Sequence, residues 1–293
     1  MIASMSDDDD RSEIFRPGLL DGMVALVTGG GTGLGLASAI ELARCGASVT
    51  ICGRRAEVLE EAVKGRMGGT ARADWISGDV RDRQDAERLV EAVLERNGRL
   101  DILVNNAGGQ YFTPAEAIVA KGWRAVWRLN VGGIANMAEA AVEAGLGSGD
   151  GGGRIVNVTL SPHHGMPGMA HSGAARATVE ALTQEWARAW ADREVAVTAV
   201  AAGHFDTEAM SKYPDTVRAG MARSVPMQRL GRPLEHAWLI ALLCSPLARA
   251  LSGSTITLDG ARDNWFGPWP PPGLTGESGE VPVEERRAAP KGG

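Results

Sequence analysis

The stretch Thr28-Gly-Gly-Gly-Thr-Gly-Leu-Gly35 decides the fold of this chain. It closes a short β-rich run, Val24 to Thr28, and opens a helical pattern, Leu34 to Arg44. Glycines in such a turn let backbone N–H groups approach a pyrophosphate at the positive end of the helix. The stretch therefore predicts a dinucleotide site, with a tight turn that binds nothing as the alternative. The candidate contacts in the turn are Gly29, Gly31, Thr32, Gly33 and Leu34.

Outward from this turn, β-rich runs alternate with helical patterns, which predicts βαβ units and a parallel sheet. The expected fold is α/β: a single-domain, Rossmann-type, doubly wound parallel sheet of seven strands flanked by helices. The expected strands are Val24 to Thr28, Ser48 to Ile51, Ala73 to Ser77, Ile102 to Val104, Ile155 to Val158, Val195 to Val200 and Thr255 to Leu258. The expected helices are Leu34 to Arg44, Ala56 to Lys64, Asp82 to Glu95, a long helix near Ala115 to Ala144, Gly173 to Trp190 and Leu234 to Leu243.

The long helix is expected to start at Thr113-Pro114-Ala115-Glu116. Thr113 is a good N-cap residue, Pro114 suits the first helical position, and Glu116 completes a capping box. Outside the helices and strands, composition marks residues 1–20 as a flexible acidic tail and 262–293 as a Pro/Gly-rich tail. The domain is therefore expected to span residues 21–261.

Composition excludes several classes of function. Of the 293 residues, 44% are hydrophobic and the net charge is −6, which argues against a surface that tracks nucleic-acid phosphates. The first residues, MIASMSDDDDR, are acidic where a signal peptide is basic, and no apolar stretch is long enough to span a bilayer. Cys45, Cys52 and Cys244 lack pairing or metal-ligand spacing. We expect a cytoplasmic protein with no membrane or nucleic-acid partner.

The end of the second strand bears on the choice of coenzyme. An NAD site usually has an acidic residue there for the ribose 2′-OH, whereas a 2′-phosphate favours arginine. This chain reads Ile51-Cys52-Gly53-Arg54-Arg55. Arg54 can meet the phosphate with charge-assisted hydrogen bonds, so NADP(H) is the expected cofactor; two solvated arginines at a helix start are the alternative.

With these motifs, the chain resembles the short-chain dehydrogenase/reductase superfamily from about Leu20 to Gly260. The matching pieces are TGGGTGLG, Asp79-Val80, Asn105-Asn106-Ala107-Gly108, Leu129-Asn130-Val131, Ala202-Gly203-His204-Phe205-Asp206-Thr207, Gly231-Arg232-Pro233-Leu234-Glu235 and Leu258-Asp259-Gly260. The resemblance implies that Asp79 and Val80 contact adenine, Asn106, Ala107 and Gly108 the adenosine ribose, and Gly203 and Thr207 the nicotinamide half.

The chain departs from the family where the family has a serine on the fifth strand and Tyr-x-x-x-Lys on the next helix. Alignment puts Leu160 at the serine position, Ser172 at the tyrosine position and Arg176 at the lysine position. A serine hydroxyl is a poor acid at neutral pH, and arginine does not release its proton. Ordinary interconversion of alcohols and carbonyls is therefore not expected.

NNAGGQ and HisSerGlyAlaAlaArgAla at 171–177 are similar to the trans-2-enoyl-CoA and 2,4-dienoyl-CoA reductase branch. That branch reduces a conjugated C=C bond through a thioester enolate, which implies oxyanion donors. Ser172 and Asn130 are the expected donors, and Arg176 is expected to orient ribose and nicotinamide. Tyr111 is a further candidate donor or proton source, with ordinary packing an equally good interpretation. The substrate would be an acyl-CoA or another thioester.

The five histidines form no metal-binding pattern, so no metal is expected. His163 and His164 suit substrate contacts or a loop surface, and His236 is expected on a helix surface. A hydrolase built from Ser161, His204 and Asp206 lacks the G-x-S-x-G context.

Two other functions stay open: a redox-neutral biosynthetic enzyme on the same scaffold (cyclisation, dehydration or isomerisation), and a non-catalytic NADP(H)-binding sensor or scaffold subunit. We also expect a homodimer or homotetramer, because the two long helices carry more apolar residues than one sheet face needs. The residues behind this expectation are Trp127, Met137, Val179, Leu182 and Trp186.

Overall fold

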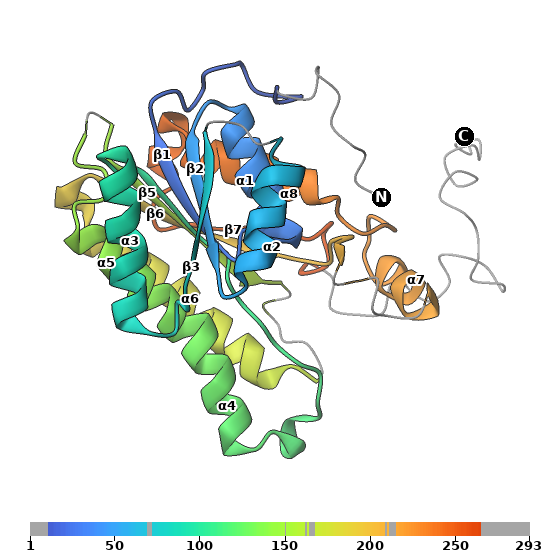
Figure 1. The fold of residues 1–293 in the computed structure, drawn as a ribbon. Coiled ribbons are helices and arrows are strands. Elements are labelled where there is room, and N and C mark those ends of the chain that lie inside the picture. The colour runs from blue at the N-terminus through green and yellow to red at the C-terminus, as the bar shows by residue number, and fades with distance from the viewer. Residues whose placement is uncertain are drawn as a thin grey trace.

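The computed structural model describes residues 11–68, 72–149, 151–161, 163, 168–208, 210 and 215–264. One parallel sheet runs through the molecule in the order β3-β2-β1-β4-β5-β6-β7 (Figure 1). Its strands are β1 Val24–Thr28, β2 Ser48–Gly53, β3 Ala73–Ser77, β4 Ile102–Asn105, β5 Gly153–Leu160, β6 Val195–Ala202 and β7 Thr255–Leu258. The order reverses between β1 and β4, and this switch point opens a crevice at the carboxyl ends of the strands.

Helices cover both faces of the sheet, which explains why β1 and β6 are buried throughout and apolar except for Thr28 and Thr198. Helices α1, α2 and α8 pack on one face and α3, α5 and α6 on the other (Figure 1). The helices are α1 Gly33–Arg44, α2 Ala56–Glu61, α3 Arg83–Asn97, α4 Ala120–Trp127, α5 Gly133–Glu143, α6 Ala170–Ala189, α7 Asp215–Arg223 and α8 Pro233–Cys244. The predicted α/β fold is confirmed, and the predicted strands agree with the observed ones to within two residues at either end.

The long helix predicted from Thr113 is wrong over residues 113–119. Only a 3-10 turn forms at Ala115–Ala117, and α4 does not begin until Ala120. Between them Ile118 and Val119 are extended, with ψ of 103° and 157°. Ile118 is buried whereas Val119 is 67% exposed, so the chain gains apolar burial by crossing here in extended form, which β-branched residues adopt readily.

A π-helical turn, Arg128–Gly132, separates α4 from α5. A second π-helical turn, Ala62–Arg66, follows α2, where the sequence predicted an α-helix through Lys64. Such turns are frequent at functional sites. The first of them carries Asn130, and it therefore sets where that side chain lies.

Residues on both sides of the 21–261 range contact the domain. Leu20 is fully buried and its N–H donates to the Cys45 carbonyl at 2.8 Å, and Ser12 hydrogen-bonds the buried Glu41. The N-terminal segment therefore packs on the domain from Ser12 onward, because Leu20 belongs to the core. At the other end Asp263 is hydrogen-bonded to the domain. His164, Tyr213 and residues 265–293 lie outside the described residues.

Three of the five residues behind the expected oligomer lie inside the subunit. Met137 and Val179 are fully buried and Trp186 is 8% exposed, all in the core beneath α3, α5 and α6. The helical pattern does not distinguish a face that packs on the sheet from one that packs on a second copy. Trp127 remains 43% exposed.

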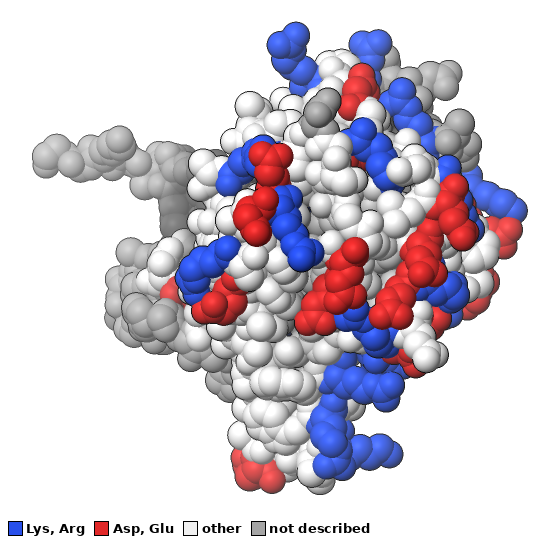
Figure 2. All heavy atoms as spheres, turned by 90° about the vertical axis from the view of Figure 1, so that its left-hand side faces the viewer, with Lys and Arg blue, Asp and Glu red and all other residues white. Residues whose placement is uncertain are grey.

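Charges alternate over the α3 and α5 face (Figure 2). Arg83 at the start of α3 donates to Glu87 at 2.7 Å and to Glu139 of α5 at 2.8 Å, and it also contacts Glu143. Acidic groups on this face are therefore partly neutralised within the subunit. Among the described residues, no helix has the length and apolar character that crossing a membrane requires.

Candidate active site

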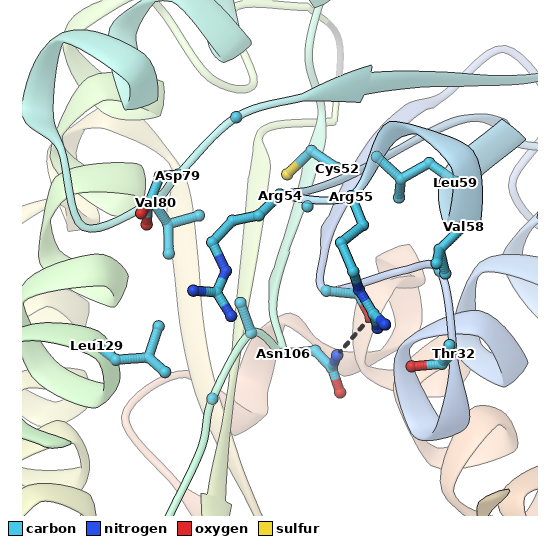
Figure 3. Close-up of a pocket in the computed structure, with 16 residues that line it drawn as sticks. Thr32, Cys52, Arg54, Arg55, Val58, Leu59, Asp79, Val80, Asn106 and Leu129 are labelled. Atoms are coloured by element: carbon cyan, nitrogen blue, oxygen red, sulfur yellow. Dashed lines mark hydrogen bonds between the residues drawn. The ribbon is translucent and has the colours of Figure 1, made fainter. Parts of the chain in front are cut away.

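A pocket of about 290 Å³ lies in the crevice at the switch point (Figure 3). Of the predicted cofactor contacts, Gly29, Gly31, Thr32, Arg54, Asp79, Val80, Asn106, Ala107 and Gly108 line it. The sequence did not single out Cys52, Gly53, Arg55, Val58, Leu59, Gly78 and Leu129, which line it too. Four of them, Gly53, Arg55, Gly78 and Leu129, adjoin residues predicted from the sequence.

The glycine turn and the end of β4 are hydrogen-bonded to each other. Asn106 Nδ2 donates to the carbonyls of Thr28 at 3.0 Å and Gly29 at 3.3 Å. The Thr28 hydroxyl accepts from the N–H groups of Asn106 and Ala107, both at 3.0 Å. A Cβ on Gly35 would lie 2.4 Å from the Gly29 carbonyl oxygen. The turn therefore requires glycine at 35, whatever it binds.

The N-terminus of α1 faces this pocket without a side-chain cap. Thr32 is the N-cap residue, yet its side chain accepts no hydrogen bond from the first turn. The first N–H groups of a helix have no intrahelical partner, and the helix dipole adds positive potential there. This end of α1 suits a diphosphate.

Two arginines extend into the pocket from the end of β2. Arg54 lies between Val80 and Asn106, and Arg55 points toward Thr32 (Figure 3). Within the described ranges, neither guanidinium has a hydrogen bond or an ion pair. Two unpaired cations on one wall favour an anionic group of the ligand at that wall.

The acid nearest these arginines is already paired. Arg81 Nε donates to the Asp79 carboxylate at 2.8 and 2.9 Å. This hydrogen bond is the largest cause that lowers the pKa of Asp79, and it outweighs desolvation. Asp79 is thus an anion that Arg81 neutralises through hydrogen bonds, whereas Arg54 adds only a smaller coulombic effect on it.

Asn130 holds the loop after β4. Its Nδ2 donates to the carbonyls of Gly109 at 2.8 Å and Val126 at 2.9 Å, and its Oδ1 accepts from the Gly109 N–H at 3.1 Å. Both amide hydrogens are therefore used in this arrangement. Asn130 is thus bonded to both backbone groups of Gly109, and this arrangement leaves no amide hydrogen for an oxyanion.

Ser172 and Arg176 lie one turn apart on α6, and both are buried. The Ser172 hydroxyl has no hydrogen-bond partner among the described residues. Arg176 Nη1 donates to the Val158 carbonyl at 2.7 Å, while its Nε is unpartnered. Burial lowers the pKa of Arg176 to about 10, so the guanidinium still carries its charge at neutral pH.

Arg176 also reaches the pocket wall at Gly108. A Cβ at that position would lie 2.2 Å from Arg176 Nη2 and 2.9 Å from Asn130 Oδ1. The arginine thus connects α6 to the cofactor pocket, although it is not one of the residues that line it. Gly33, Leu34, Gly203 and Thr207 do not line this pocket either, but Thr207 Cβ is 3.8 Å from a Cβ built on Gly33.

Tyr111 packs between two helices. Its ring meets that of His171 edge-on, with centroids 4.5 Å apart, and a Cβ on Gly122 of α4 would lie 2.0 Å from its hydroxyl. The Trp123 ring is also edge-on to His171, with centroids 6.1 Å apart. Tyr111 thus packs on His171 and α4 while 42% of it stays exposed.

The prediction that His236 lies on a helix surface is wrong. His236 is fully buried between α8 and α1, with its Nδ1 3.3 Å from the Ser38 hydroxyl. The face of α8 that carries His236 is not exposed, because α1 covers it.

Among the described residues, no three His, Cys, Asp or Glu side chains are grouped to hold a metal ion.

The family described as enoyl-(acyl carrier protein) reductase matches residues 29–261. The chain therefore belongs to the short-chain dehydrogenase/reductase superfamily, whose members are oxidoreductases that bind a nicotinamide cofactor. The matched region begins at the glycine turn, directly after β1, and ends just beyond β7.

Curated and solved relatives agree with this assignment. A peroxisomal 2,4-dienoyl-CoA reductase of Arabidopsis thaliana is 34% identical, over 84% of this chain and 86% of its own length. A citronellol catabolism dehydrogenase of Pseudomonas aeruginosa PAO1 is 39% identical with a TM-score of 0.75, over 85% of this chain and 98% of that one. An actinorhodin polyketide ketoreductase solved with NADPH is 29% identical with a TM-score of 0.78, over 85% of this chain and 100% of that one.

Proposed function

We propose that this protein is an NADPH-dependent reductase of a C=C bond conjugated to a thioester. The observation that carries the proposal is the pair Ser172 and Arg176. They stand where the family resemblance places Tyr and Lys, and they provide a buried free hydroxyl and a buried cation without a carboxylate. The dienoyl-CoA reductase among the relatives supports the same class of reaction.

The residues of the pocket fit NADPH. Arg54 and Arg55 would bind the 2′-phosphate, the first turn of α1 the diphosphate, and Asp79 and Val80 would contact adenine. When bound, NADPH supplies the hydride. Gly203 and Thr207 would flank the nicotinamide half, with Arg176 placed to hold its ribose.

Side chains of the protein would then stabilise the negative charge that develops on the substrate. Addition of hydride to the far carbon of the conjugated system moves negative charge onto the thioester oxygen, and preorganised donors stabilise such an oxyanion. Ser172 would donate its hydroxyl and Arg176 would add positive charge from the same helix face. Asn130 would act by holding Gly109, to which it is bonded at both backbone groups. The carbon next to the thioester would take its proton from water.

The test is NADPH oxidation with crotonyl-CoA, with a longer 2,4-dienoyl-CoA, and with simple ketones. We expect both thioesters to be reduced and ketones to be poor substrates. Because loss of one oxyanion donor costs about 10²–10³ in rate, Ser172→Ala should lower kcat by that factor with NADPH affinity kept. Thr178→Ala, on the same helix and bonded only to the Ala174 carbonyl, is the matched control.

Efficient turnover of ketones without turnover of the thioesters would refute the proposal. Turnover of neither would favour the redox-neutral enzyme or the NADP(H) sensor. Titration of NADPH binding by fluorescence separates these two outcomes from loss of the cofactor site.

A further inference from the structure

His163 lies between two carboxylates from different parts of the fold. Its Nε2 is 3.0 Å from Glu180 Oε1 on α6, and its Nδ1 hydrogen-bonds the carboxylate of Asp263, which follows β7. The His163 backbone N–H donates to the same carboxylate at 2.6 Å. His163, which follows β5, is thus bonded both to α6 and to the segment after the last strand.

A neutral imidazole does not satisfy both side-chain contacts. It has one N–H donor and one acceptor nitrogen, whereas an ionised carboxylate only accepts. In the neutral form either Glu180 or Asp263 would face a nitrogen lone pair. Protonated His163 donates from both nitrogens, so the observed arrangement fits the imidazolium.

The surroundings favour this proton. The side chains of Glu180 and Asp263 are only 16% and 13% exposed, and the Thr159 hydroxyl donates to the same Glu180 oxygen at 2.8 Å. Desolvation is the largest single effect on His163 and lowers its pKa. The hydrogen bonds and charges of Asp263 and Glu180 together outweigh it and raise the pKa above the ordinary 6.5.

The bridge continues toward the candidate active site. The Asp263 N–H donates to Asp259 Oδ2 at 2.7 Å, and Ser161 hydrogen-bonds the same oxygen. A Cβ on Gly203, a candidate nicotinamide contact, would lie 2.5 Å from Asp259 Cβ. The carboxyl ends of β5, β6 and β7 therefore meet at Asp259, and Asp263 holds that meeting point.

The remaining titratable and charged groups at this edge lie around Asp259. His204 follows β6. Burial is the largest cause that lowers its pKa; the charge of Arg262 lowers it further, and the charge of Asp259 raises it. Arg262 bonds Asp259 through its backbone N–H at 3.1 Å. These groups face Asp259, so Glu180 and Asp263 are the two charges that act on His163 itself.

We propose that His163 is a positioning residue of this site, which in its protonated form ties the end of β5 and the segment after β7 to α6. Loss of the proton removes the side-chain hydrogen bond to one of the two carboxylates, which then faces a nitrogen lone pair. Because the folded-state pKa lies above the unfolded value, the bridge is complete below about pH 6.5 and is lost as the pH rises through the folded pKa. The inference rests on the proposed function only where it predicts catalysis.

The proton is tested by NMR titration of the histidine resonances of the full chain. We expect His163 to titrate above 6.5, and Glu180→Gln or Asp263→Asn each to lower its pKa, with each unit a tenfold change in proton affinity. Glu185→Gln, on the same helix and 68% exposed, should leave it unchanged. A pKa at or below 6.5 that neither variant moves would overturn the proposal.

The positioning role is tested by amide hydrogen exchange of residues 259–264, corrected for intrinsic rates. We expect protection to fall in the parent between pH 6 and pH 9. It should be low at both values in His163→Gln and stay high at both in His163→Arg, because a guanidinium donates to two carboxylates at any of these pH values. If arginine does not fit at position 163, the comparison of His163→Gln with the parent still tests the positioning role.

The same variants carry the prediction into catalysis. The alkaline decline of enoyl reduction in the parent should move to higher pH in His163→Arg. Exchange rates do not need turnover, so a protein that reduces no enoyl thioester would refute the proposed function while leaving the His163 test intact. Equal pH dependence of protection in parent and His163→Gln would refute the positioning role.

Discussion

Arg54 and Arg55 form a cationic wall at the end of β2, where many nucleotide sites of this fold have an acid. Their guanidinium groups point into the pocket and have no partner among the described residues (Figure 3). Since Asp79 is paired with Arg81, it competes little for Arg54. A phosphate on the adenosine ribose would therefore find unpaired donors on one side of the pocket.

We expect NADPH to bind more tightly than NADH, and Arg54→Asp to reverse the order. A charge-assisted hydrogen bond contributes about 1.5–3 kcal/mol, which corresponds to roughly 10- to 150-fold in affinity. The new carboxylate would accept from the ribose 2′-OH. Arg188→Asp, a surface change far from the pocket on α6, is the control. Fluorescence titrations that give the parent equal affinities for the two coenzymes would contradict the argument.

For single residues, the sequence predicted positions whose role depends on the backbone. It missed roles that depend on how side chains pack. Gly29 and Asn106 follow from strand-turn-helix context, because their neighbours are fixed by the fold. The direction of the Tyr111 hydroxyl depends on a glycine eleven residues later on α4, at Gly122. The hydrogen bonds of Asn130 depend likewise on a π-helical turn that no pattern in the sequence indicates.

At the scale of the elements, the packing of α1 against α8 should make the free energy of unfolding depend on pH. His236 is fully buried there, edge-on to Phe205 with centroids 5.7 Å apart. Burial lowers the pKa of His236 to about 4. The unfolded chain binds this proton near 6.5 and the folded chain does not, so stability falls as the pH drops from 6.5 toward 4. Over the whole window the loss is about 3 kcal/mol.

We expect His236→Leu to remove this acid sensitivity. The free energy of unfolding of the variant minus that of the parent should be about 2 kcal/mol larger at pH 5 than at pH 7. Ser38 stays satisfied, since its hydroxyl also donates to the Leu34 carbonyl at 2.8 Å. Urea unfolding at the two pH values gives both free energies, and the pH 7 pair corrects for any change in packing. Parallel losses of stability in parent and variant would show that His236 is not the group responsible.

At the scale of the whole molecule, the sheet was predictable because its strands are apolar runs too short for helices. The core under α3, α5 and α6 was harder to recognise, since Val179 and Trp186 look the same in sequence whether they pack on a sheet or on another subunit. Leu20 belongs to the same core as α1 and α8, although acidic and Pro/Gly composition surrounds it in the sequence.

The surface of α4 still favours assembly with a second copy. Trp123 and Trp127 are 36% and 43% exposed, beside Val119 at 67%. Large aromatic side chains are costly to leave in water, and clustered ones mark interaction sites.

We expect a homodimer or homotetramer that covers this face of α4. Trp127→Glu would place a charge in the contact and shift the mass measured by light scattering toward the monomer, with the unfolding midpoint of the subunit little changed. Leu247→Glu, which alters a residue 76% exposed after α8, should leave the mass as it is. A monomeric mass for the parent at micromolar concentration would mean that these tryptophans face solvent, and the argument from exposed aromatic surface would fail for this protein.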